Sequence, residues 1–289
     1  MDHAADLSEV NCTRAILWAF TLALTYVGSL YIWRAKEHRD HPSTIKKRFV
    51  SVFAILCISP LFVVFGADLA YFNKGATIPA LLGLRLAGLA QAVLLPLVLT
   101  MVLFTGPLVL HYFDGIWSLY IGKSPGYWYS NLKNLIWLRN HIVAPLSEEF
   151  TFRACMLPLL VPCLGQRAAI LICPLFFGVA HLHHLTEKLA RTSDVKLVVM
   201  QSVFQFGYTT IFGAYSVYLF LRTGHFVAPF VAHAFCNHMG FPDMSEVFGY
   251  RQPRLSLLLL AFLGGLLAWA SLLEPLTRPD IYHNNLYAS

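Results

Sequence analysis

Charged side chains are scarce in this sequence. Only 12% of its 289 residues are Asp, Glu, Lys or Arg, whereas soluble domains typically carry about 25%. The hydrophobic fraction is 57%, and the mean hydropathy is +0.60. A chain this poor in charge does not supply the polar surface of an ordinary soluble domain, so its composition predicts a membrane protein.

Several catalytic and metal-binding motifs are also missing. The sequence has no HExxH motif and no glycine-rich phosphate loop, which argues against a zincin metalloprotease and a nucleotide-dependent enzyme. Its six cysteines show no CxxC pair and no zinc-binding spacing, and most lie in apolar stretches. We therefore expect the cysteines to be small buried hydrophobic residues.

Long apolar segments recur along the chain. Five are uncharged runs long enough to cross about 30 Å of hydrocarbon as a helix, and three more contain polar motifs. The eight segments are 15–33, 49–67, 86–110, 134–161, 168–184, 197–221, 226–241 and 255–273. They predict an all-α, polytopic membrane protein with about eight transmembrane helices around a conical polar cavity. No internal repeat is visible, and we expect a single domain over residues 1–289.

The basic residues are distributed unevenly over the connections between these segments. With the N-terminus in the lumen, the cytosolic connections hold 13 Lys and Arg and the lumenal ones hold 6. The positive-inside rule therefore favours this orientation. The net charge of +6 is then explained by topology and by attraction to anionic lipid, and we expect no nucleic-acid partner. The residues before the first segment are acidic rather than basic, so we expect that segment to remain as an anchor.

Two adjacent glutamates lie in the fourth segment. On a helix Glu148 and Glu149 point about 100° apart, and Arg153 lies four residues after Glu149, on the same face. We therefore expect an ion pair between Glu149 and Arg153, which leaves Glu148 to face a cavity as the reactive carboxylate. The alternative is that all three form a structural charge cluster that joins helices. Pro145 is expected to weaken the helix just before the pair.

Histidines and an asparagine provide the remaining polar groups. Phe177 and His181 are four residues apart, and so are His233 and Asn237, so each pair shares one helix face. His181 suits the orientation of a water molecule, whereas His183 and His184 are expected to reach toward the membrane surface. An imidazole and a carboxamide together suit a developing oxyanion. An interhelical hydrogen bond is an equally good interpretation of the second pair.

The spacings EExxxR, FxxxH and HxxxN resemble those of the type II CAAX prenyl proteases, a family of intramembrane glutamate proteases. In this sequence they are carried by Glu148-Glu149-Arg153, Phe177-His181 and His233-Asn237. The similarity is strong over residues 140–243, in blocks such as APLSEEFTFRACMLPLL, PLFFGVAHLHH and HAFCNHMGFP. The remaining residues match the family only in general hydrophobic layout.

The resemblance implies an eight-helix enzyme of the endoplasmic reticulum membrane whose active site opens to the cytosol. Such an enzyme removes the last three residues of prenylated CAAX proteins, among them Ras-like GTPases and lamin-type proteins, beside the membrane lipid. Glu148 would activate a water held by His181, with Glu149, Arg153 and Phe177 in support.

His233 and Asn237 would stabilise the oxyanion of this reaction, and no cofactor is needed. Two alternatives remain open at this point. One is a zinc-dependent version of the same hydrolysis with Glu148, His181 and His233 as ligands. The other is a non-catalytic prenyl-protein receptor or a transporter.

Overall fold

The computed structural model describes residues 3–33, 37–73, 75–117, 125–182, 189, 192 and 194–287. These residues form helices, turns and irregular connections, and no strand is present among them. The longer helices are α1 (His3–Ser29), α2 (Pro42–Gly66), α5 (Leu89–Leu103), α6 (Thr105–Phe113), α8 (Pro125–Lys133), α11 (Leu157–Ala180), α13 (Val195–Thr223), α14 (Val227–Met239) and α16 (Arg254–Leu276).

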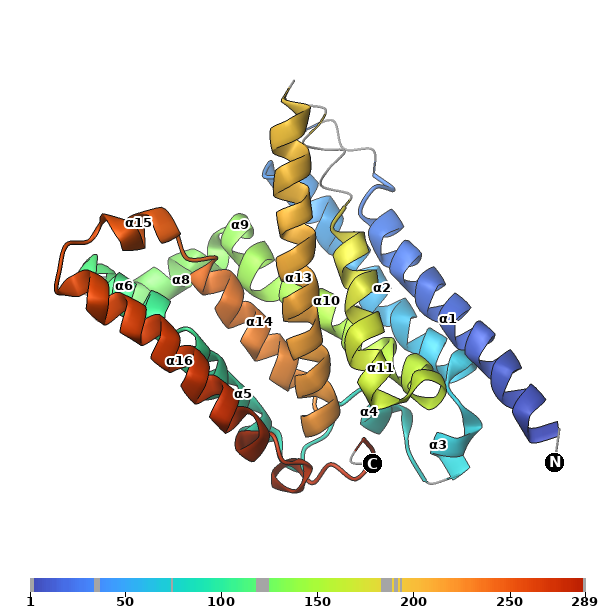
Figure 1. The fold of residues 1–289 in the computed structure, drawn as a ribbon. Helices are drawn as coiled ribbons and strands as arrows, with labels where there is room; N and C mark the ends of the chain where they lie inside the picture. Colours follow the sequence, from blue (N-terminus) through green and yellow to red (C-terminus); the bar gives the residue numbers. More distant parts are fainter. Residues whose placement is uncertain are drawn as a thin grey trace.

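Short helical segments connect or interrupt the longer helices. They are α3 (Leu69–Asn73), α4 (Ile78–Leu81), α9 (Leu135–Leu138), the π-helical η1 (Arg139–Val143), α10 (Ala144–Glu149), the π-helical η2 (Phe150–Cys155), α15 (Met244–Gly249) and the 3₁₀-helical η3 (Pro279–Tyr282). In Figure 1, α1, α2 and α11 form one flank, α13 and α14 occupy the middle, and α5 and α16 form the opposite flank.

Four helices among the described residues are long and apolar enough to cross a membrane: α2, α11, α13 and α16. A fifth span results if α5 and α6 are counted together as one broken crossing. The predicted all-α, polytopic membrane fold is therefore confirmed. The predicted count of eight crossings is not, since α14, for example, has only 13 residues and about 20 are needed to span the hydrocarbon.

The segment 86–110 is not the single helix expected from its apolar composition. α5 and α6 meet at Phe104 with a bend of 67°. Pro107 follows the break and lacks the N–H that a continuous helix would use. Gly106 lies so close to Phe262 of α16 that an added Cβ would come within 2.3 Å of its ring. The bend and the missing side chain allow both α5 and α6 to pack against α16.

The stretch 134–161 is also not one α-helix. The π-helical turns η1 and η2 flank α10, which carries both glutamates, and α11 begins only at Leu157. Pro145 is the second residue of α10 and has no N–H to donate, which accounts for the interrupted bonding pattern there. π-helical turns inside α-helices are frequent at functional sites.

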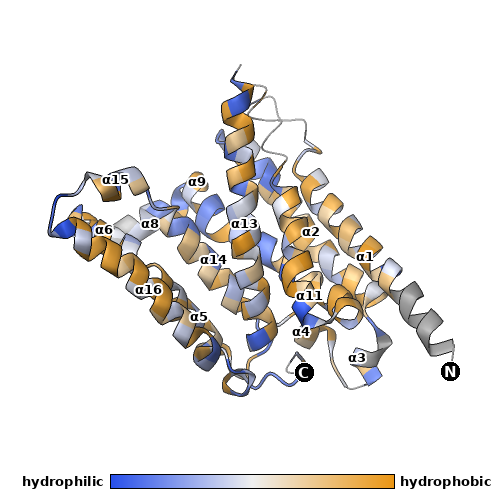
Figure 2. Ribbon diagram, viewed as in Figure 1, coloured by the Kyte–Doolittle hydropathy of each residue, from blue (hydrophilic) through white to orange (hydrophobic). Residues whose placement is uncertain are grey.

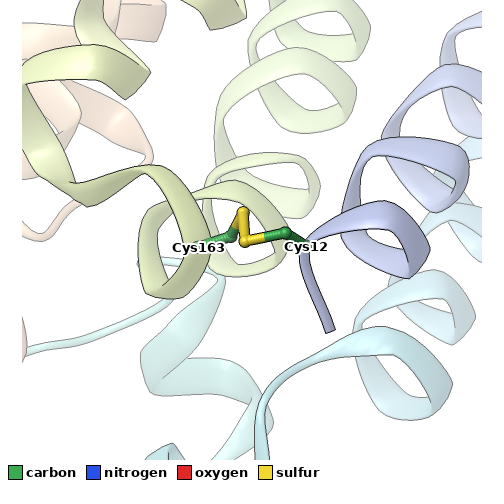
Figure 3. The surroundings of a disulfide bond; sticks show 2 residues. All are labelled: Cys12 and Cys163. Carbon is green, nitrogen blue, oxygen red and sulfur yellow. A yellow bond between two sulfur atoms is a disulfide. The ribbon is translucent and has the colours of Figure 1, made fainter. Parts of the chain in front are cut away.

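A disulfide joins Cys12 of α1 to Cys163 of α11, with a Cα–Cα distance of 5.1 Å (Figure 3). The expectation that the cysteines are buried hydrophobic residues is wrong for this pair and for Cys57, which is exposed, although it holds for Cys155 and Cys173. The partners are 151 residues apart, so no local spacing could have indicated the pairing. α11 is kinked just beyond this point at Gly165, where φ is 72° and the left-handed conformation favours glycine.

Hydrophobic residues cover much of the outside of the bundle. Figure 2 shows this along most of α1, α11 and α16, with hydrophilic segments at the ends of the bundle and also behind α13 and α14. On α16 only Leu258 and Gly265 are buried. Its exposed leucines include Leu257, Leu259, Leu260, Leu263, Leu266 and Leu267. An apolar surface of this extent fits a protein surrounded by lipid.

Candidate active site

A cavity of about 980 Å³ opens between the helices, with walls from α1, α2, α5, η1, α10, η2, α11, α13, α14 and α16. The structure brings five of the seven predicted site residues to this wall. They are Glu148, Phe177, His181, His233 and Asn237. The other two, Glu149 and Arg153, are fully buried behind it.

Glu149 lies at the centre of a buried polar cluster. Its Oε2 is 3.1 Å from Nε of Arg153, which confirms the predicted ion pair, although the angle falls short of hydrogen-bond geometry. Its Oε1 accepts a 2.7 Å hydrogen bond from Nδ1 of His233. No pattern in the sequence indicates this second contact, because it joins two residues 84 positions apart in the chain. Glu149 therefore supports the imidazole as well as the guanidinium.

The ring of Phe177 contacts one guanidinium and two imidazoles of the site. The guanidinium carbon of Arg153 lies 4.3 Å from the centre of its ring, a cation–π contact that helps to stabilise a buried charge. The same ring packs edge-on against His181 at 4.5 Å and against His233 at 6.2 Å. The supporting role expected for Phe177 thus corresponds to contacts with three site side chains.

Glu148 differs sharply from its neighbour in the sequence. Its side chain is 18% exposed, whereas that of Glu149 is 0% exposed. Its Oε2 lies 3.7 Å from Nε2 of His233, an ionic contact longer than a hydrogen bond. The two carboxylates therefore face opposite edges of one imidazole, and Glu148 is the one that opens to the cavity.

The two histidines have defined orientations. Nδ1 of His181 lies 2.8 Å from the carbonyl oxygen of Phe177, and a carbonyl only accepts, so Nδ1 carries the proton. The same argument places a proton on Nδ1 of His233, because its partner is the carboxylate of Glu149. In His233 the other ring nitrogen, Nε2, is the one that faces Glu148. His183 and His184 lie outside the described residues.

Asn237 shares the helix face of His233, as expected, and is exposed to the cavity. Its Nδ2 donates a 2.9 Å hydrogen bond to the backbone carbonyl of Asn140. This is the interhelical hydrogen bond that the sequence suggested as the alternative role. The carboxamide has a second N–H, so this contact and an oxyanion contact are compatible.

Two features near the site were not predicted. Tyr26 of α1 is buried, and its hydroxyl lies 3.0 Å from that of Ser147, the residue before Glu148. Arg139 donates from Nε to Oδ1 of Asn140, at 3.0 Å. Neither contact has a signal in the sequence, because the first joins residues 121 positions apart and the second depends on the η1 turn.

A catalytic zinc ion needs three protein ligands that converge on one point. Within the described part of the chain, no three His, Cys, Asp or Glu side chains converge in a way that could hold a metal ion. Glu148, His181 and His233, the ligands of the zinc-dependent alternative, therefore do not form such a set in this conformation.

Comparison with known proteins identifies the family of this chain. Residues 130–239 match the family described as type II CAAX prenyl endopeptidase, Rce1-like, which includes every predicted site residue. No solved structure matches the chain.

Three curated relatives are all called CAAX prenyl protease 2. The protein of Homo sapiens is 45% identical over 276 residues, which cover 94% of this chain and 83% of that protein. The relative from Rattus norvegicus is 41% identical over 94% of this chain and 82% of its own length. That of Arabidopsis thaliana is 34% identical over 98% and 95%. These identities extend over nearly the whole chain. The chain therefore belongs to the type II CAAX prenyl endopeptidases, a family of proteases.

Proposed function

We propose that this chain hydrolyses the peptide bond that follows the prenylated cysteine of a CAAX protein, with Glu148 as the general base. The main support is the contrast between two adjacent carboxylates. Glu149 is buried and bound to Arg153 and His233, whereas Glu148 opens to the cavity. A carboxylate that lies outside the buried ion pair and reaches the cavity is the one suited to proton transfer.

Water attack begins with the removal of one proton. Glu148 takes this proton, and the resulting hydroxide adds to the carbonyl carbon of the prenylcysteine. Nε2 of His181 accepts a hydrogen bond from the same water and orients it. The proton of this ring is on Nδ1, which donates to the carbonyl of Phe177. The fixed tautomer makes this ring an acceptor toward the cavity.

Stabilisation of the oxyanion is the task of His233 and Asn237. His233 already donates from Nδ1 to Glu149, so its Nε2 donates to the oxyanion only when the ring carries both protons. The carboxylates on its two sides, Glu149 at 2.7 Å and Glu148 at 3.7 Å, stabilise that imidazolium. Asn237 supplies its second N–H. Removal of one such donor typically costs about 10²–10³ in rate.

The last step of the reaction is the transfer of this proton from Glu148 to the leaving group. Glu148 returns it to the leaving nitrogen as the C–N bond breaks, which gives the carboxylate of the prenylcysteine and the amine of a tripeptide. No covalent intermediate, cofactor or nucleic acid takes part.

The expected substrates are prenylated CAAX proteins such as Ras-like GTPases and lamin-type proteins, bound beside membrane lipid. We place the enzyme in the endoplasmic reticulum membrane, with the cavity open to the cytosol. The disulfide supports this orientation, because Cys12 and Cys163 both lie in connections assigned to the lumen by the basic-residue distribution. Disulfides persist in that oxidising compartment.

The deciding experiment uses the purified full-length chain in detergent and a farnesylated CAAX peptide. We expect mass spectrometry to detect the released tripeptide with the wild type and not with Glu148→Gln. Binding of the peptide without a product would favour the receptor alternative. Loss of activity on dialysis against a chelator, with recovery on addition of zinc alone, would favour the zinc-dependent alternative.

A further inference from the structure

The wall of the cavity is basic in one part and apolar in another. Arg39, Arg48 and Arg139 line it from the segment before α2, from α2 itself and from η1. Leu103 of α5 and Trp269 of α16 line it from the flank opposite α2 in Figure 1. Among the described residues Glu148 is the one carboxylate on this wall.

We infer that Arg139 and Arg48 bind the C-terminal carboxylate of the substrate, the group that ends the released tripeptide. The inference rests on the proposed function, because that function brings a carboxylate into the cavity three residues beyond the scissile bond. A guanidinium is well suited to a carboxylate, since it is planar, permanently charged and rich in donors.

Arg139 is held in place on two of its three nitrogens. Nε donates to Oδ1 of Asn140 at 3.0 Å, and Nη1 donates to Oδ1 of Asp40 at 2.9 Å and to the carbonyl of Arg39 at 3.1 Å. No acceptor for Nη2 is found in the described part of the chain. The side chain is 14% exposed and lines the cavity, so a fixed cation presents a donor there.

Arg139 shares its carboxylate partner with a second arginine. Asp40 is the carboxylate that pairs with Arg139, and Arg39 lies 3.8 Å from the same oxygen. Burial acts to raise the pKa of Asp40, but the hydrogen bond and charge of Arg139 outweigh this and hold the pKa below its usual value. Arg48, on α2 beside η1, lies 5.7 Å from the ring centre of Tyr31. Two guanidinium groups, those of Arg39 and Arg139, thus lie within 4 Å of the same carboxylate oxygen.

The spacing along the chain fits a tripeptide. Arg139 lies nine positions before Glu148, which is roughly 13 Å at the rise of an α-helix. Three extended residues span roughly 10 Å, and the hydrogen bond from the carboxylate to the guanidinium adds about 3 Å. A substrate with its carboxylate at Arg139 therefore places its scissile bond beside Glu148.

This placement also orients the rest of the substrate. With the carboxylate at the arginines and the scissile carbonyl at Glu148, the prenyl group points to the apolar wall formed by Leu103 and Trp269. The cavity would then select the bond three residues from the end of the chain by measuring from the carboxylate.

The test compares two farnesylated CAAX peptides that differ only at the C-terminus, one a free acid and the other an amide. For wild-type enzyme we expect kcat/KM to be about 10- to 100-fold higher for the acid, the range for a hydrogen bond to a charged group. Arg139→Gln and Arg48→Gln should each bring this ratio toward one. Lys47→Gln, an exposed charge change on the same helix as Arg48, should leave it unchanged.

Each outcome has a distinct meaning. If wild-type enzyme cleaves neither peptide, the proposed function fails. If it cleaves both equally well, the carboxylate site is wrong and the proposed function stands. The site is also wrong if the arginine variants slow both peptides by the same factor, since that would show a positioning role. The ratio is measured within one preparation, so a lower folded fraction does not affect it. If Arg139→Gln yields no active enzyme, the wild-type ratio and Arg48→Gln decide.

Discussion

Residues 139–155 and α16 (residues 254–276) show two opposite ways to place a chain in a membrane. α16 is one regular helix of 23 residues with two buried positions. Residues 139–155 are broken into η1, α10 and η2 and include the fully buried Glu149 and Arg153. Helical regularity is kept where the chain meets lipid and is lost where it holds the polar cluster.

The difference has a physical cause. In hydrocarbon every backbone polar group needs an internal partner, which a regular helix supplies, whereas irregular backbone is tolerated only inside the protein or beside a cavity. Residues 139–155 meet that condition, because α2, α11, α13 and α14 pack around them. The irregularity is also useful, since η1 places the carbonyl of Asn140 opposite Asn237.

The sharpest test of this contrast removes the reactive carboxylate alone. Glu148→Gln should lower kcat by about 10²–10⁴ and leave the detergent melting temperature close to that of the wild type, because Glu148 lies outside the buried ion pair. Steady-state cleavage of a farnesylated peptide and a thermal melt measure the two quantities. Turnover above about a tenth of the wild-type rate would contradict the general-base role, since a general base contributes at least roughly 10².

Removal of the buried cation should damage the fold instead. Arg153→Met leaves Glu149 without its ionic partner, at a cost of about 3–5 kcal/mol in the free energy of unfolding. The double variant Glu149→Gln/Arg153→Met removes both charges and should recover part of that stability. It should not recover activity, because His233 loses its carboxylate. If the melting temperatures of both variants equalled that of Glu148→Gln, the buried pair would have no greater structural role than Glu148.

Asn237 can serve as a donor to the oxyanion, as a structural hydrogen-bond partner of Asn140, or as both. If it donates to the oxyanion, Asn237→Ala should lower kcat by about 10²–10³ with little change in KM. If it serves only to bond Asn140, the variant should lose about 1 kcal/mol of stability and keep most of its kcat. Full kinetics together with a melt distinguish these results.

The disulfide provides a test far from the cavity. Cys163→Ser should reduce the free energy of unfolding by about 2–4 kcal/mol while kcat stays within about twofold of the wild-type value for the folded enzyme. Cys173→Ser is a control for the loss of a thiol that is not in the disulfide. A large fall in kcat for Cys163→Ser at a temperature where the variant is folded would show that the disulfide shapes the site.

The smallest effect is expected on the lipid-facing helix. Leu266 is 49% exposed, so Leu266→Ala should change stability by no more than about 0.5 kcal/mol. Leu22→Ala, at a position with 0% exposure on α1, should cost about 2–5 kcal/mol. Similar costs at the two sites would mean that this face of α16 is covered by protein.

The parts of the site that the sequence predicted are those that depend on one helix. The four-residue spacing of Glu149 and Arg153 predicted a contact that is present at 3.1 Å. The same spacing predicted that Phe177 and His181 meet, and their rings are 4.5 Å apart. Neighbours on one helix are fixed by its geometry, so these contacts needed no knowledge of the fold.

What the sequence did not predict depends on how separate helices meet. The bond from His233 to Glu149 requires α14 to cross α10 at one register. The bend between α5 and α6 depends on the close approach of Gly106 to α16. Hydrophobic runs report how long an apolar segment is, and they do not record which turns are π-helical or where a helix breaks.

The bond between Cys12 and Cys163 also says something about the order in which this protein is made. α1 emerges from the ribosome early, but its covalent partner is 151 residues further along the chain. At about 5–20 residues per second, synthesis of that interval takes roughly 10–30 s. During this time the first helix is held in the membrane by non-covalent contacts alone, and only afterwards can oxidation join α1 to α11.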